Sequence, residues 1–76
     1  MPFIHVYAYS GKNNETKKKA AQAIAKAVSE TIDAPEFTIT VVYEDIAPDV
    51  WAKNVVQDII IPLRDKIIID HGNLVD

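Results

Sequence analysis

Apolar and polar residues alternate or recur in patterns that divide the first half of the chain into three elements. Residues 3–9 are rich in β-branched and aromatic types, which predicts a strand. From Glu15 to Ile32 the pattern is helical. Its predicted apolar stripe consists of Ala20, Ile24, Ala27, Val28 and Ile32. Residues 37–44 alternate again and predict a second strand. Short joints between these elements favour a βαβ unit with two parallel strands and a right-handed crossover.

Polar residues mark where the predicted helix begins and ends. Asn13 or Asn14 can cap its first turn, and Glu15 then places a negative charge where the helix dipole favours one. The helix should end at residues 33–35, because Pro35 disfavours helical geometry at the residue before it.

The second half of the chain predicts helices of a different kind. Pro48 suits the first turn of a helix, and Pro62 should kink or break that helix near Ile61. The apolar residues that repeat at helical spacing before the break are Trp51, Val55, Val56, Ile59 and Ile60. A second short helix with Leu63, Ile67 and Ile68 should stop around residues 70–72, and residues 73–76 form a tail or an exchanged arm.

These elements predict one α+β domain over residues 1–76, a βαβ unit followed by C-terminal helices. Two strands and one helix leave a sheet face and a sheet edge uncovered. A chain of 76 residues without cysteine forms only a marginal core and has no disulfides to compensate. We therefore expect a homo-oligomer, and specifically a dimer whose two protomers join into a four-stranded sheet.

Charge and hydropathy exclude several classes of partner. The net charge of −3 argues against binding to nucleic acid or to an anionic membrane. No stretch approaches the length of a transmembrane helix, and the N-terminus lacks the features of a signal peptide. These features predict a cytoplasmic protein.

Few side chains suggest a catalytic or metal site. His5 and His71 lack ligand spacing, so we expect neither a metal nor a cofactor. His5 is more typical of a hydrogen-bonded structural histidine in a strand. Glu44 and Asp45 are neighbours on a strand and point to opposite faces, which favours solvation over a shared substrate. The run Lys17-Lys18-Lys19 is more typical of a solvated helix face than of a phosphate site.

Three features in order resemble the 4-oxalocrotonate tautomerase family. They are Pro2 at the start of a strand, Gly11-Lys12 after it, and residues 33–35 leading into a second strand. The resemblance covers residues 2 to about 51. Residues 46–72, with Trp51, Pro62 and Gly72, are more similar to the longer, dimeric bacterial branch than to the short hexameric one.

The resemblance implies that Pro2 is the general base in keto–enol tautomerisation of a 2-oxo acid. Lys12 stands where the family usually has an arginine, and it lacks the bidentate fork of that residue. A second family arginine falls at Thr40. The resemblance places Trp51, Tyr9 and Thr38 around the substrate.

The proposed base has two chemical requirements. Met1 must be removed, because an acylated proline nitrogen is an amide and has no basicity. The pKa of the free amine must also lie near neutrality, which burial against Trp51 and Phe3 with Lys12 nearby would favour. With one arginine missing, a monoacid such as phenylpyruvate is the expected substrate. Two alternatives stay open: a non-catalytic oligomer that binds a small apolar carboxylate, and a related proline-dependent hydratase or dehalogenase.

Overall fold

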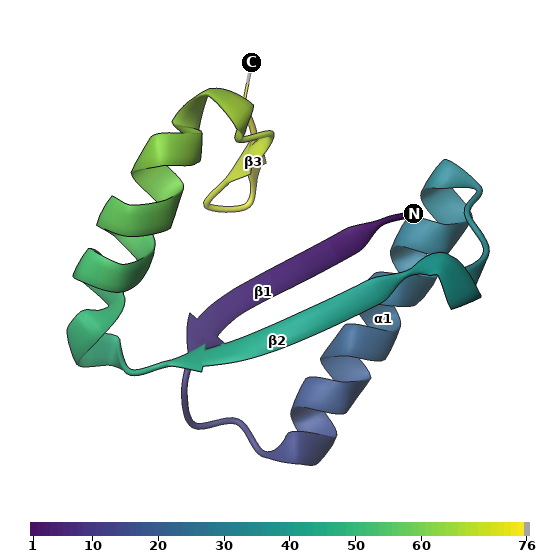
Figure 1. Cartoon of the computed structure of the whole chain (residues 1–76), viewed down its shortest axis with the longest axis horizontal. Coiled ribbons are helices and arrows are strands. Elements are labelled where there is room, and N and C mark those ends of the chain that lie inside the picture. The colour runs from purple at the N-terminus through teal and green to yellow at the C-terminus, as the bar shows by residue number, and fades with distance from the viewer. Residues whose placement is uncertain (76) are drawn as a thin grey trace. The chain divides into compact units, whose positions relative to one another are not determined.

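The computed structural model describes residues 1–75, and their contacts gather in two compact units, Met1–Ile46 and Ala47–Asp76 (Figure 1). The first unit contains strand β1 (Phe3–Tyr9), helix α1 (Asn14–Ile32), the short 3-10 helix η1 (Glu36–Thr38) and strand β2 (Thr40–Ile46). β1 and β2 are parallel and hydrogen-bonded. The predicted α+β class and its βαβ unit are thus confirmed, and β1 has the predicted bounds.

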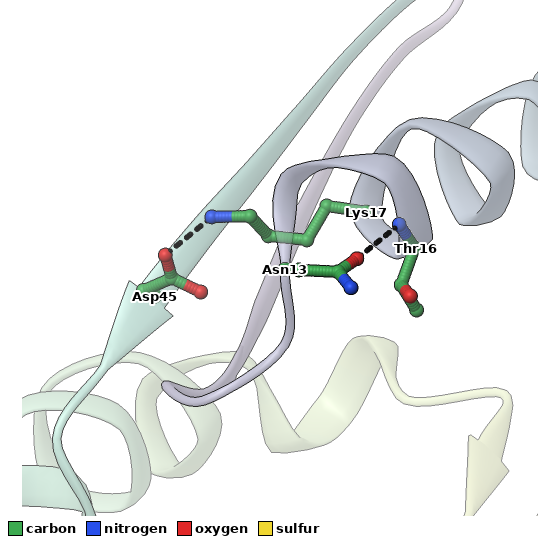
Figure 2. A network of polar contacts seen from close by, with 4 residues as sticks. All are labelled: Asn13, Thr16, Lys17 and Asp45. Atoms are coloured by element: carbon green, nitrogen blue, oxygen red, sulfur yellow. Dashed lines mark hydrogen bonds and ion pairs between the residues drawn. The ribbon is translucent and has the colours of Figure 1, made fainter.

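The strand register assigns each side chain of the sheet to one of two faces. Phe3 pairs with Thr40, and the pairing runs to Tyr9 opposite Ile46. Because side chains alternate along a strand, Val41, Tyr43 and Asp45 share one face. Helix α1 covers this face. Lys17 of α1 places its Nζ 2.6 Å from Oδ2 of Asp45 (Figure 2). The same Nζ lies 6.0 Å from the ring centroid of Tyr43.

The bounds of α1 follow from its caps. Asn13 Oδ1 accepts a hydrogen bond from the Thr16 N–H at 2.8 Å, as Figure 2 shows. At the other end Asp33 adopts a left-handed conformation, with φ 58° and ψ 47°, and its N–H bonds to Ser29 O. One of the two predicted caps and the predicted end are therefore confirmed.

The apolar stripe of α1 is displaced from the predicted one. The half-buried side chains are Lys17, Ala20, Ala21, Ile24, Ala25, Val28 and Ser29. Ala27 is exposed, and the side chain of Ile32 is 58% exposed. The residues of α1 that pack on the sheet determine which side chains are half-buried, and the first of them is Lys17. Because Lys17 is charged, the spacing of apolar residues alone did not include it.

Strand β2 begins at Thr40, three residues later than predicted. Residues 36–38 form η1 instead, in which the Thr38 N–H donates to Pro35 O at 3.0 Å. Phe37, predicted to lie on the strand, is 90% exposed. Because β1 begins only at Phe3, it offers no partner for residues 37–39, and local 3-10 bonds satisfy these backbone groups.

The second unit is helical and then turns back on itself. It contains a 3-10 helix η2 (Pro48–Val50), a π-helix η3 (Ala52–Ile60), a 3-10 helix η4 (Ile61–Lys66) and short strands β3 (Ile69–Asp70) and β4 (Asn73–Leu74). Lys53 Nζ lies 2.6 Å from Asp58 Oδ1, a pair five residues apart, as i→i+5 winding allows. The change from η3 to η4 at Ile61 confirms the predicted break before Pro62.

The predicted end of the last helix was wrong. The helix ends at Lys66, and residues 69–74 form an antiparallel hairpin in which Ile69 faces Leu74. His71 and Gly72 at its turn have φ of 48° and 85°. Two consecutive positive φ values match the twist of a two-residue hairpin. Residues 73–75 thus belong to the hairpin and its end, whereas Asp76, also predicted as tail, lies outside the described residues.

Burial within residues 1–75 is slight. Val55, 3% exposed, is the one buried hydrophobic side chain in this range. Phe3 and Tyr9 of β1 are 64% and 53% exposed, and the outer edges of β1 and β2 have no strand partner in this range. Across the same residues, no helix is long and apolar enough to cross a membrane.

The cap of α1 yields a stability prediction. Asn13→Ala removes the acceptor for the Thr16 N–H and should lower the free energy of unfolding by about 1 kcal/mol. Urea unfolding at fixed protein concentration measures the change. Asn14→Ala is the matched control, because Asn14 is the first residue of α1 and does not cap it. Equal losses in the two variants would contradict the assigned cap.

Candidate active site

Pro2 continues β1 by one residue and is held by the sheet. Its carbonyl oxygen accepts the N–H of Thr40 at 3.1 Å, and its side chain is half-buried. Met1, which precedes it, is 96% exposed. The backbone of Pro2 is thus fixed on the carbonyl side, while the residue attached to its nitrogen makes little contact with the chain.

Thr38 and Thr40 lie at the same end of the sheet as Pro2. Thr40 pairs with Phe3, the residue after Pro2, and Thr38 is two positions before Thr40. The Thr38 hydroxyl donates to Pro35 O at 2.7 Å, so its proton is already engaged and its oxygen can still accept. The side chain of Thr40, at the position of the second family arginine, is exposed and carries no charge.

Tyr9 and Lys12 lie at the opposite end of the sheet. Tyr9 pairs with Ile46, and the following Ser10 N–H donates to Ile46 O at 2.9 Å. Gly11 then turns the chain with φ 126°, a conformation that side chains disfavour, and the exposed Lys12 follows. Figure 1 shows the N-terminus and the loop before α1 at opposite ends of β1.

The length of β1 separates Pro2 from Lys12. Its seven residues span about 23 Å at about 3.3 Å each, farther than a lysine side chain reaches. The expectation that Lys12 lies near Pro2 is therefore wrong within one chain. The predicted site residues of the first unit form two groups, Pro2 with Thr38 and Tyr9 with Lys12. The substrate-binding roles assigned to Tyr9, Thr38 and Lys12 stay predictions.

Trp51 belongs to the second unit. It is half-buried and joins η2 to the π-helix η3, whose side chains include the buried Val55. Longer i→i+5 winding is rare in proteins and is frequent at functional sites. A role for Trp51 beside Pro2 stays a prediction.

The sheet also holds a polar pair that sequence patterns did not connect. His5 Nε2 lies 2.8 Å from Glu44 Oε1, and the His5 ring stacks on Tyr7 with centroids 4.1 Å apart. The predicted hydrogen-bonded His5 is confirmed. The expectation that Glu44 and Asp45 are merely solvated was wrong, because Asp45 binds Lys17. The two acids do point to opposite faces, as predicted, and only the register reveals their partners.

The sequence-predicted site residues of the first unit offer the chemistry of an amine and one cation. Pro2 would supply a secondary amine once Met1 is removed, and Lys12 supplies an exposed ammonium group for a carboxylate. Within residues 1–75, no three His, Asp or Glu side chains gather in a way that could hold a metal ion.

Comparison with known proteins gives a consistent result. A family model described as tautomerase enzyme matches residues 2–58. Probable tautomerases of Bacillus cereus and Bacillus anthracis are each 38% identical over 52 residues, covering 68% of this chain and 85% of those proteins. A 2-hydroxymuconate tautomerase of Comamonas testosteroni is 29% identical over 51 residues, or 67% of this chain and 81% of that protein. With a βαβ unit that opens on Pro2 and a family match over most of its length, the chain belongs to the tautomerase family and is an isomerase.

Proposed function

We propose that Pro2, freed by removal of Met1, is the general base that interconverts the keto and enol forms of a small 2-oxo acid. The observation that carries this proposal is the position of Pro2: the family match begins at this residue, and the Thr40 N–H holds its carbonyl at the end of the sheet. The two compact units act together as one tautomerase domain.

The reaction needs one base that becomes one acid. The Pro2 amine takes a proton from the carbon next to the substrate carbonyl, the electron pair of that C–H bond forms the C=C bond, and the carbonyl π pair moves to the oxygen. The resulting ammonium gives its proton to that oxygen, which completes the enol and restores the free amine; the enol-to-keto direction runs the same steps in reverse. Proton transfer of this kind by a positioned group contributes about 10²- to 10⁴-fold to the rate. The step requires a free lone pair, which an acylated nitrogen lacks.

A monoacid suits the charges at this site. Lys12 supplies one cation for one carboxylate, and Thr40 supplies none where relatives have a second arginine. The only arginine in the sequence, Arg64, lies in the second unit, where its Nη1 donates to Ile61 O at 3.1 Å. The Comamonas relative is named for 2-hydroxymuconate, a dicarboxylate. For this chain we propose a phenylpyruvate-like substrate instead.

A second copy of the chain brings the two ends of the sheet together. When two β1 strands pair antiparallel through their outer edges, the Pro2 end of one lies opposite the Lys12 end of the other. The pairing also satisfies an edge that has no partner within residues 1–75 and yields the expected four-stranded sheet. In the proposed homodimer each site takes Pro2 from one protomer and Lys12 from its partner.

Removal of Met1 provides the first test of the base. Two forms of the protein that differ only in Met1 are separated and identified by intact mass. The form that begins at Pro2 should convert phenylenolpyruvate to its keto form, followed by ultraviolet absorbance. The form that keeps Met1 should be inactive, because its Pro2 nitrogen is an amide.

Pro2→Ala is the companion variant. It keeps an amine but changes its basicity and its rigid attachment, so kcat/KM should fall by about 10²-fold. Equal activity of Met1-bearing and processed protein, or of Pro2→Ala and wild type, would refute Pro2 as the base. Turnover of an unsaturated or halogenated acid by the processed form, without enol turnover, would instead indicate the hydratase or dehalogenase alternative.

Hybrid dimers test whether the site is shared. Pro2→Ala and Lys12→Ala chains are mixed in equal amounts, unfolded and refolded together. A hybrid then has one site with both intact residues and one with neither, so about a quarter of wild-type activity should return. Each variant refolded alone is the control. A mixture no more active than the mean of its two components would place the complete site within one chain.

Substrate charge can be tested at Thr40. Thr40→Arg adds a cation near Pro2 and should raise kcat/KM for 2-hydroxymuconate by about ten-fold, because a charge-assisted bond to the second carboxylate becomes possible. The rate with phenylenolpyruvate should change little. Thr40→Gln, of similar length but neutral, is the control. A wild-type protein that prefers the diacid would contradict the monoacid assignment.

A further inference from the structure

A pocket of about 210 Å³ lies between α1 and β2, apart from the residues assigned to catalysis. Asn14, Lys17, Lys18 and Ala21 of α1 line it together with Val41 and Tyr43 of β2. β1 contributes no side chain to it, so the pocket opens beside the outer edge of β2. The floor is apolar, and the polar groups stand around it.

The charges around this pocket are unequal. Lys17 is neutralised by Asp45, 2.6 Å away, and keeps only 21% of its side chain exposed. Lys18 makes no ion pair or hydrogen bond within residues 1–75. The Tyr43 hydroxyl likewise has no hydrogen-bond partner in that range. The pocket thus offers one uncompensated positive charge and a free hydroxyl donor above an apolar floor.

We infer that this pocket binds a small apolar monocarboxylate at a site separate from Pro2. The Ala21 and Val41 side chains and the Tyr43 ring receive the apolar body, while Lys18 and the Tyr43 hydroxyl bind the carboxylate. Binding of a dianion is disfavoured, because Lys17 is already paired with Asp45 and the Asp45 carboxylate adds a negative charge nearby.

The size of the pocket limits the ligand. Sites for drug-sized molecules measure about 300–1,000 Å³, so this smaller and open pocket suits a single ring or a branched aliphatic group. Because Pro2 does not line this pocket, an aromatic acid can occupy it and leave the proposed catalytic amine free.

Titration followed by backbone amide NMR tests the inference. Phenylacetate is added to ¹⁵N-labelled protein, and the neutral isostere phenylacetamide is added to a second sample. Phenylacetate should shift the amides of residues 17–21 and 41–43, and phenylacetamide should bind more weakly. Lys18→Gln should weaken phenylacetate binding about five-fold, because an exposed charge pair contributes up to about 1 kcal/mol.

Matched variants separate this pocket from general charge effects. Lys19→Gln makes the same charge change outside the pocket, at a side chain that is 75% exposed and pairs with Glu15, and should leave binding unchanged. Ala21→Leu fills the pocket and should abolish the shifts, whereas Ala27→Leu on the exposed face of α1 should not. Shifts confined to Phe3 and Thr38, at the Pro2 end of the sheet, no shifts at residues 17–21, or equal weakening by Lys18→Gln and Lys19→Gln would overturn the inference.

Discussion

The parallel pairing of β1 with β2 decides where every group in the first unit lies. Parallel strands require a crossover, and α1 supplies it by running back over one face of the sheet. The same register that bonds Thr40 to Pro2 also places Tyr9 opposite Ile46. Pro2 and Lys12, the candidate carboxylate-binding cation, therefore lie at opposite ends of β1, and the proposed function needs a second chain to bring them together.

Each face of the sheet in this unit carries a pair of charged or titratable side chains. On the α1 face, Lys17 reaches across to Asp45 and ties the helix to β2. On the other face, His5 bonds to Glu44 beside the stacked ring of Tyr7. These pairs leave few cations without a partner in the unit. Lys12 follows β1 and Lys18 lies on the surface of α1. Lys12 is therefore available for the substrate of the proposed reaction, and Lys18 for the inferred ligand.

The sequence predicted an element well where residues within or next to that element determine its bounds. The Asn13 cap and the Pro35 stop determine α1, and the β-branched run determines β1. Phe37 alternates like a strand residue, yet β1 has no residue left to pair with it. A glycine such as Gly72 is typical of a helix end as well as of a hairpin turn. The sequence was therefore interpreted as a helix that stops there, and the short strands on either side of His71 and Gly72 were missed. For the candidate site, Pro2 and Lys12 could be named from the sequence, but their separation depends on the strand register, which pairs residues far apart in the chain.

A base formed from the main chain differs from one formed from a side chain in how it is held. Pro2 has no χ torsion between its nitrogen and the backbone, and its carbonyl is already bound to Thr40. Ordering a long catalytic side chain costs up to about 2 kcal/mol of rotamer entropy, and a ring nitrogen at the end of a strand avoids that cost. Met1 is almost wholly exposed, so cutting it away disturbs no packing. On the proposed mechanism, a single proteolytic cut both unmasks the reactive atom and leaves it at a position that the sheet already fixes through Thr40.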